Sequence, residues 1–228
     1  MISTPTAQTH YAPAEAPLEI LYEDAHLLVL NKPCGLLSVP GRGPDKQDCL
    51  SARVQRRYPD ALIVHRLDMQ TSGLLAMARG IDAQRALNRA FEQRLVHKRY
   101  QAVVDGIACV EGLDAWGVID LPLELDWPNR PKHIVDYAHG RPSVTRWRVL
   151  SPDLERNGTR LELEPVTGRS HQLRVHLQAI GHPILGDDLY ASAEAVARAS
   201  RLLLHACELN LPHPATGEVM SFSSPPPF

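Results

Sequence analysis

Apolar and polar positions alternate in short runs along most of this chain, and the runs predict more strands than helices. Two apolar runs within residues 18–32 are separated by Glu23 and Asp24, which predicts a pair of strands. Strand patterns also occur at residues 98–105, 144–150, 160–164, 202–211 and 218–222. Because the strands outnumber the helices without regular alternation, we expect one α+β domain with a largely antiparallel mixed sheet flanked by helices.

Three segments show the 3.6-residue period of a helix. Residues 48–58 place apolar side chains on one side, with Asp48 as the expected N-cap. Residues 81–96 carry an apolar stripe that we assign to the core and not to a binding site. A third helix is expected at residues 170–180, where Gly181 ends it.

Composition and charge exclude several classes of protein. The chain has 228 residues with 44% hydrophobic content, enough for one large core. No apolar run could span a bilayer and the start lacks an export signal, so we expect a cytoplasmic protein without a membrane partner. The net charge is −2, but basic side chains concentrate in residues 42–99 and 130–148. Such local surfaces can bind phosphates, although solvated arginines are the alternative interpretation.

The most informative stretch is a polar loop between two apolar runs, IVHRLDMQTSGLL at residues 63–75. The pattern predicts strand, loop, strand. Gly73 can adopt backbone angles that other residues avoid, and Thr71 can hydrogen-bond nearby backbone, so we expect a tight turn that orients Asp68. From local chemistry alone, an ordinary connection with an Arg66–Asp68 surface pair is an equally good interpretation.

This stretch resembles the signature of the RluA family of RNA pseudouridine synthases, through HRLDxxTSG at residues 65–73. Two matches follow in the family's order: KRYQA at 98–102, and TGRSHQLRVH at 167–176 with GHPILGD at 181–187. The step Lys32-Pro33 also resembles the family's opening segment; Lys32 could reach the active site or be a plain turn residue. The resemblance implies a pseudouridine-synthase-type catalytic domain at 18–228, with its active-site cleft across the sheet. Residues 1–17, rich in Ala, Pro and Thr, are expected to be a disordered lead-in.

Three catalytic residues are implied by this resemblance. Asp68 matches the family's catalytic aspartate, and Arg169 matches the basic residue that pairs with it. Tyr100 matches the tyrosine that stacks on the target base and whose hydroxyl can assist proton transfer. Pseudouridine formation moves uracil from an N-glycosidic to a C-glycosidic bond, and one carboxylate suffices, either by attacking the sugar carbon or by removing a sugar proton.

Three substrate-binding residues are implied in the same way. Leu173 matches the apolar residue on the other side of the base. Arg66 matches the residue that fills the gap left when the target base is flipped out of its stack. Thr71 lies in the same motif as Asp68. The structural alternative for Tyr100 and Leu173 is a place in the core.

The sequence predicts neither a cofactor nor a metal. Isomerisation of uridine needs no metal, nucleotide or redox group. His65, His171, His176 and His205 lie near the motifs, but His171 and His176 are five residues apart, off the four-residue spacing of paired ligands on a helix. The four cysteines are scattered, without the close pairs of metal or redox sites.

The expected partner is RNA. The compact chain, with DWPNRPK at residues 126–132 and no separate N-terminal RNA-binding module expected, resembles the RluA branch itself. That branch modifies uridines in 23S rRNA and in the anticodon loop of tRNA, and we expect a monomer. The alternative is a non-catalytic RNA-binding or ribosome-assembly protein on the same fold, which would have no need for Asp68, Tyr100 and Arg169 together. A metal-dependent hydrolase is the third hypothesis.

Overall fold

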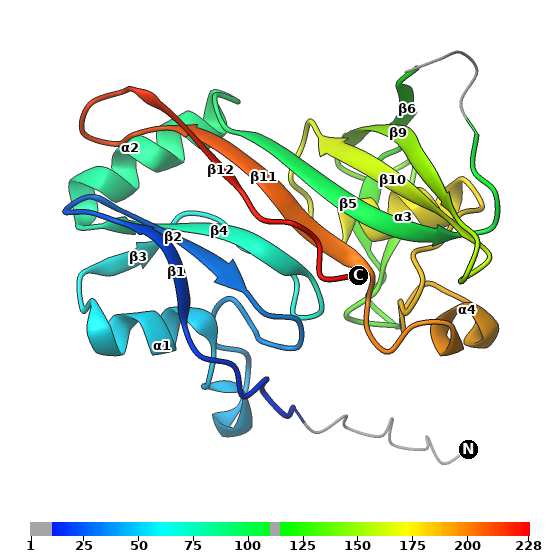
Figure 1. Cartoon of the computed structure of the whole chain (residues 1–228), viewed down its shortest axis with the longest axis horizontal. Coiled ribbons are helices and arrows are strands. Elements are labelled where there is room, and N and C mark those ends of the chain that lie inside the picture. Colours follow the sequence, from blue (N-terminus) through cyan, green and yellow to red (C-terminus); the bar gives the residue numbers. More distant parts are fainter. Residues whose placement is uncertain (1–10, 110–114) are drawn as a thin grey trace.

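A large, strongly twisted sheet forms the centre of the computed structural model, which describes residues 11–109 and 115–228 (Figure 1). In the described residues it has ten strands, in the order β1-β2-β4-β11-β5-β10-β9-β6, with β12 paired to β11 and β3 paired to β4. The bounds are β1 Glu19–Glu23, β2 Leu27–Lys32, β3 Ala61–Ile63, β4 Ser72–Arg79, β5 His97–Asp105, β6 Gly117–Asp120, β9 Val144–Asp153, β10 Gly158–Pro165, β11 Leu204–Pro212 and β12 Val219–Ser223. Among the strands of the described residues, only β4 and β11 pair in parallel, which confirms the largely antiparallel mixed sheet.

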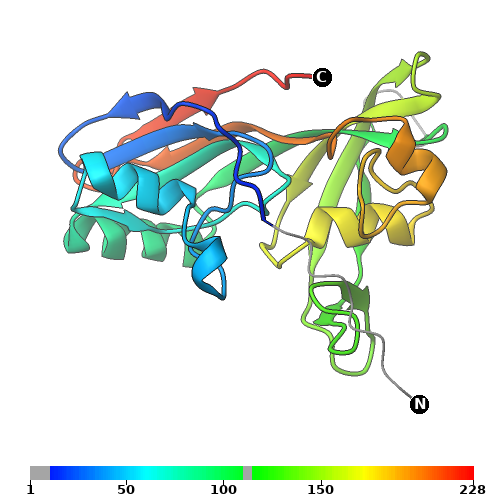
Figure 2. The ribbon, with the colours of Figure 1, turned by 90° about the horizontal axis from the view of Figure 1, so that it is seen from below.

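Helices are few and mostly short. They are α1 Leu50–Arg57, α2 Ile81–Glu92, α3 Gln172–Ala179 and α4 Ala193–Ala197, with a 3₁₀ turn at Pro44–Lys46. None of the helices in the described ranges is both long and apolar enough to cross a membrane. A separate two-stranded sheet, β7 Leu123–Leu125 with β8 His133–Val135, belongs to a segment that extends away from the body of the protein (Figure 2).

The consecutive apolar residues at the start of β2 explain why helices pack on both sides of the first half of the sheet. Leu28 and Leu30 belong to one core cluster, which includes Leu50 and Val54 of α1. Leu27 and Val29 belong to a second core cluster, which includes Ala83 and Leu87 of α2. Because successive side chains of a strand point to opposite faces, one apolar run supplies both clusters.

Several boundaries differ from the expectations. Helix α1 begins after Cys49 and has no side-chain cap, because both carboxylate oxygens of Asp48 accept hydrogen bonds from Arg53 at 2.8 and 2.7 Å. Helix α2 ends at Glu92, before Arg94 takes a left-handed φ of 58°. The short elements α4 and β6 to β8 were not predicted, because three to five residues show no clear period.

The expected disordered lead-in is only partly testable. Residues 1–10 lie outside the described residues. Residues 11–17 form no helix or strand, yet they pack against the protein. Tyr11 is buried, and its hydroxyl donates to the Asp48 carbonyl at 2.9 Å. The guanidinium of Arg53 donates to the carbonyl of Ala14 at 2.9 Å. One aromatic side chain and these hydrogen bonds therefore hold residues 11–17 against the body of the protein.

Candidate active site

Asp68 lies in the loop between β3 and β4, and backbone contacts fix the shape of this loop. The hydroxyl of Ser38 donates to the Leu67 carbonyl at 2.7 Å and accepts from the Leu67 amide at 3.1 Å. The Thr71 amide closes the turn on the Asp68 carbonyl at 3.1 Å. At Gly73, φ is 111° and a Cβ atom would lie 2.3 Å from the Ala206 carbonyl oxygen, so glycine is required where β4 meets β11. The tight turn predicted around Asp68 is present.

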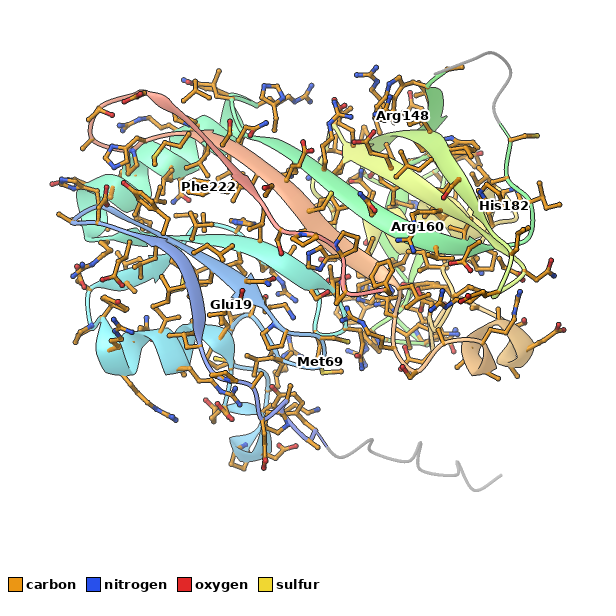
Figure 3. The ribbon with its side chains drawn as sticks, in the orientation of Figure 1. Glu19, Met69, Arg148, Arg160, His182 and Phe222 are labelled. Atoms are coloured by element: carbon orange, nitrogen blue, oxygen red, sulfur yellow. The ribbon has the colours of Figure 1, made fainter. Side chains whose placement is uncertain are left out.

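Lys32 supports the same loop from behind. Its side chain is fully buried, and the Nζ donates to the carbonyls of Pro33, Leu36 and Met69 at 2.9, 2.7 and 3.0 Å. Met69 directly follows Asp68, and Figure 3 labels it at the loop that leads into β4. Burial lowers the pKa of Lys32 to about 7. Lys32 is thus neither a plain turn residue nor part of the cavity around Asp68; it fixes the loop that carries Asp68.

A cavity of about 510 Å³ opens around Asp68. Five parts of the chain line it: the loop before β4, the end of α2 with the residues after it, strand β5, the segment from the end of β10 into α3, and Leu204 at the start of β11. The cavity therefore spans both halves of the sheet. All six residues implied by the motifs line it, namely Arg66, Asp68, Thr71, Tyr100, Arg169 and Leu173.

Tyr100 and Leu173 supply buried walls of this cavity, from β5 and α3 respectively. Burial, together with the charge of Asp68, raises the pKa of the Tyr100 hydroxyl. At neutral pH this hydroxyl keeps its proton, so it can donate a hydrogen bond but cannot act as a base. The two apolar surfaces and the nearby carboxylate can accommodate a planar ring beside a reactive acid group.

The ion pair expected between Asp68 and Arg169 is not formed. Among the described residues, Arg174 is the arginine that approaches the carboxylate, with its Nη1 3.9 Å from Asp68 Oδ2. Arg174 is almost fully buried and makes a bidentate pair with the buried Asp187, at 2.7 and 2.6 Å. Because Asp187 fixes the planar guanidinium, the remaining nitrogen is directed to Asp68. Arg169 is exposed at the rim of the cavity.

A second group near Asp68 is His171, which sequence reasoning weighed only as a metal ligand. Its Nε2 lies 4.0 Å from Asp68 Oδ2, and its Nδ1 lies 2.7 Å from the Tyr190 hydroxyl. A usable signal was present in the sequence: His171 and Arg174 are three residues apart in the helix predicted over 170–180, a spacing that places two side chains on one helix face. The family resemblance instead assigned the pairing with Asp68 to Arg169, which lies in the same motif.

The other histidines near the motifs have structural partners. The Nε2 of His65 accepts a hydrogen bond from the Ala76 amide at 2.9 Å, and burial lowers its pKa to about 3. His176 contacts the Thr145 hydroxyl at 2.9 Å, and His205 contacts Ser72 at 2.8 Å. His171 therefore lies at the cavity and His176 in the core, so the two histidines do not form a common site.

The cavity is rich in positive charge that no carboxylate neutralises. Arg66, Arg94, Lys98 and Arg169 all line it, and none of these four has a carboxylate partner in the part of the chain that the structure describes. Lys98 is half-buried beside the Phe91 ring, 6.0 Å from its centroid, and burial lowers its pKa. A cavity with two acidic side chains, Asp68 and Glu92, and several unpaired cations suits a polyanionic ligand.

Comparison with known proteins relates the chain to one family. The sequence pattern of the family described as RNA pseudouridylate synthase matches residues 26–179. The chain is 51% identical over 220 residues to the dual-specificity RNA pseudouridine synthase RluA of Escherichia coli K12, covering 96% of this chain and 98% of that protein. It is 48% identical to the Vibrio vulnificus protein of the same name, covering 97% and 89%.

Solved structures show the same fold. Human RNA Pseudouridylate Synthase Domain Containing 1 superimposes with a TM-score of 0.74 at 30% identity, covering 93% of this chain and 84% of that one. The human Domain Containing 4 protein gives a TM-score of 0.68 at 28% identity, covering 92% and 88%. Both the family and the fold expected from the motifs are confirmed. The chain belongs to the RNA pseudouridylate synthase family.

Proposed function

We propose that this protein isomerises uridine to pseudouridine in structured RNA, with 23S rRNA and the tRNA anticodon loop as its substrates. The observation that carries the proposal is Asp68 in a cavity between Tyr100 and Leu173, paired with Arg174 and surrounded by unpaired cations. The names of the relatives that match nearly the whole chain support a dual specificity. We further propose a cytoplasmic monomer that needs no cofactor.

In the proposed reaction the bond between uracil N1 and the ribose carbon breaks, and a bond from uracil C5 to that carbon forms. N1 gains a proton and C5 loses one, so the product is an isomer. Asp68 acts either by attacking the sugar carbon or by removing a sugar proton. Arg174 orients the carboxylate. Tyr100 and Leu173 flank the base while it turns.

Incubation with unmodified transcripts of 23S rRNA and tRNA, followed by mapping of pseudouridine, tests this function. We expect new pseudouridine at discrete uridines in both RNAs. Retention of RNA without any new pseudouridine would instead support the non-catalytic RNA-binding protein. Modification of only one RNA class would contradict the proposed dual specificity but not the proposed isomerase activity.

Arg66→Ala should slow reaction on a structured hairpin more than on a short unstructured RNA with the same uridine. Unstacking a base costs a few kcal/mol in a folded loop and less in an open strand, and a planar guanidinium recovers part of this cost. The structure favours this role, because Arg66 is exposed at the cavity and does not pair with Asp68 in the described chain. Single-turnover rates on both RNAs measure the difference, and equal losses would indicate a brace for the loop.

A further inference from the structure

His171 occupies a position between the proposed catalytic carboxylate and a buried tyrosine. Its side chain is only 12% exposed, with Nδ1 2.7 Å from the Tyr190 hydroxyl and Nε2 4.0 Å from Asp68 Oδ2. The residue occupies the N-cap position of α3 with a left-handed φ of 56°, which is uncommon for a residue other than glycine. Strain of this kind persists where neighbouring contacts enforce it, and it is enriched at functional sites.

The hydrogen bonds around Tyr190 determine which nitrogen of His171 carries the proton. The backbone N–H of His133, in β8, donates to the Tyr190 hydroxyl oxygen at 2.8 Å. In the described part of the chain, His171 Nδ1 is the hydrogen-bond partner of this hydroxyl that can accept its proton. Burial raises the pKa of Tyr190 to about 12, so the hydroxyl keeps this proton. Nδ1 is therefore the acceptor, and the ring proton lies on Nε2, on the side of Asp68.

The charge of the imidazole follows from its surroundings. Burial lowers the pKa of His171 to about 4. Of the charged and titratable groups around it, Asp68 and Asp187 raise this pKa, whereas Arg174 and His133 lower it. The ring is therefore neutral at neutral pH. It contributes a directed N–H group, and Arg174 contributes the positive charge.

We propose that His171 is a positioning residue for Asp68, acting as a neutral Nε2–H donor whose tautomer is set by Tyr190 and the β8 backbone. The 4.0 Å separation is longer than a direct hydrogen bond, and the proposal requires it to shorten in the complex with substrate, as catalytic hydrogen bonds commonly do. The chain of contacts joins Asp68 to the extended segment that carries β7 and β8 (Figure 2). The catalytic consequence rests on the proposed function, whereas the tautomer itself does not.

Two substitutions separate this role from a purely structural one. In His171→Gln the amide nitrogen can reach the place of Nε2, whereas in His171→Asn it reaches only the place of Nδ1. We expect His171→Asn to lower kcat about 10-fold to 100-fold with KM for RNA unchanged, and His171→Gln to retain most of the activity. A structural role predicts the reverse order, because Asn tolerates a left-handed backbone better than Gln. Asn equal to or better than Gln would overturn the proposal.

The tautomer can be measured in the unsubstituted protein. In ¹⁵N-histidine-labelled protein at pH 7 we expect His171 to show a protonated Nε2 and an unprotonated Nδ1. Tyr190→Phe removes the proton donated to Nδ1 and should yield a mixture of tautomers, with kcat falling toward that of His171→Asn. A protonated Nδ1 or an imidazolium in the wild-type protein would overturn the proposal. If instead no RNA is isomerised, the proposed function fails while this spectrum still reports on His171.

Discussion

Asp68→Asn is expected to abolish isomerisation, by at least about 10⁴-fold, while the fold and the RNA affinity stay nearly unchanged. The substitution is nearly isosteric, and the Ser38, Lys32 and Thr71 contacts that shape the loop involve backbone atoms around residue 68, not its carboxylate. The amide can neither attack the sugar carbon nor accept its proton. Release of tritium from RNA labelled at uracil C5 measures the reaction, and RNA binding is measured in parallel.

Asp188→Asn is the matched control for this experiment. Its carboxylate lies 3.5 Å from the same arginine, Arg174, but the side chain is 62% exposed and does not line the cavity. The control removes one negative charge from the neighbourhood without touching the proposed chemistry, so it should retain activity. Near-native turnover by pure Asp68→Asn would show that another residue is the essential catalyst.

Arg174→Met should have the largest effect on stability, with the free energy of unfolding falling by about 3–5 kcal/mol. The reason is that Asp187, which is fully buried, loses both hydrogen bonds from the guanidinium and is left as an uncompensated charge. Asp68 loses its arginine at the same time. Urea unfolding measures the first effect and single-turnover kinetics the second. Arg169→Gln is the comparison, because an exposed arginine without a carboxylate partner should change stability by less than about 0.5 kcal/mol.

The double variant Arg174→Met with Asp187→Asn separates stability from catalysis. Asparagine carries no charge, and its carbonyl oxygen can still accept from the amides of Leu189 and Tyr190, as Asp187 does at 3.0 and 3.2 Å. We expect much of the stability to return while the rate stays at least about 100-fold low, since Asp68 remains without its arginine. Recovery of both together would mean that Arg174 acts on catalysis only through the fold.

Much of the fold was predictable, because local patterns carry most of its elements. The strand patterns and most of the helix predicted over 81–96 follow from periodicity. Their arrangement was predictable only as a class. That β11 would lie between β4 and β5, parallel to one and antiparallel to the other, depends on pairing between residues more than 100 positions apart. No local pattern encodes such a contact.

The sequence by itself determined the family and six of the residues that line the cavity, because the three motifs and their order are specific. Only the tertiary structure decided which arginine reaches Asp68. That choice depends on where α3 lies relative to the Asp68 loop and on Asp187, which directs the guanidinium of Arg174. It also decided the place of Lys32, whose charge is buried because the neighbouring loops offer three carbonyls. Contacts across the fold set these roles, since charge and burial are properties of the surroundings and not of the residue type.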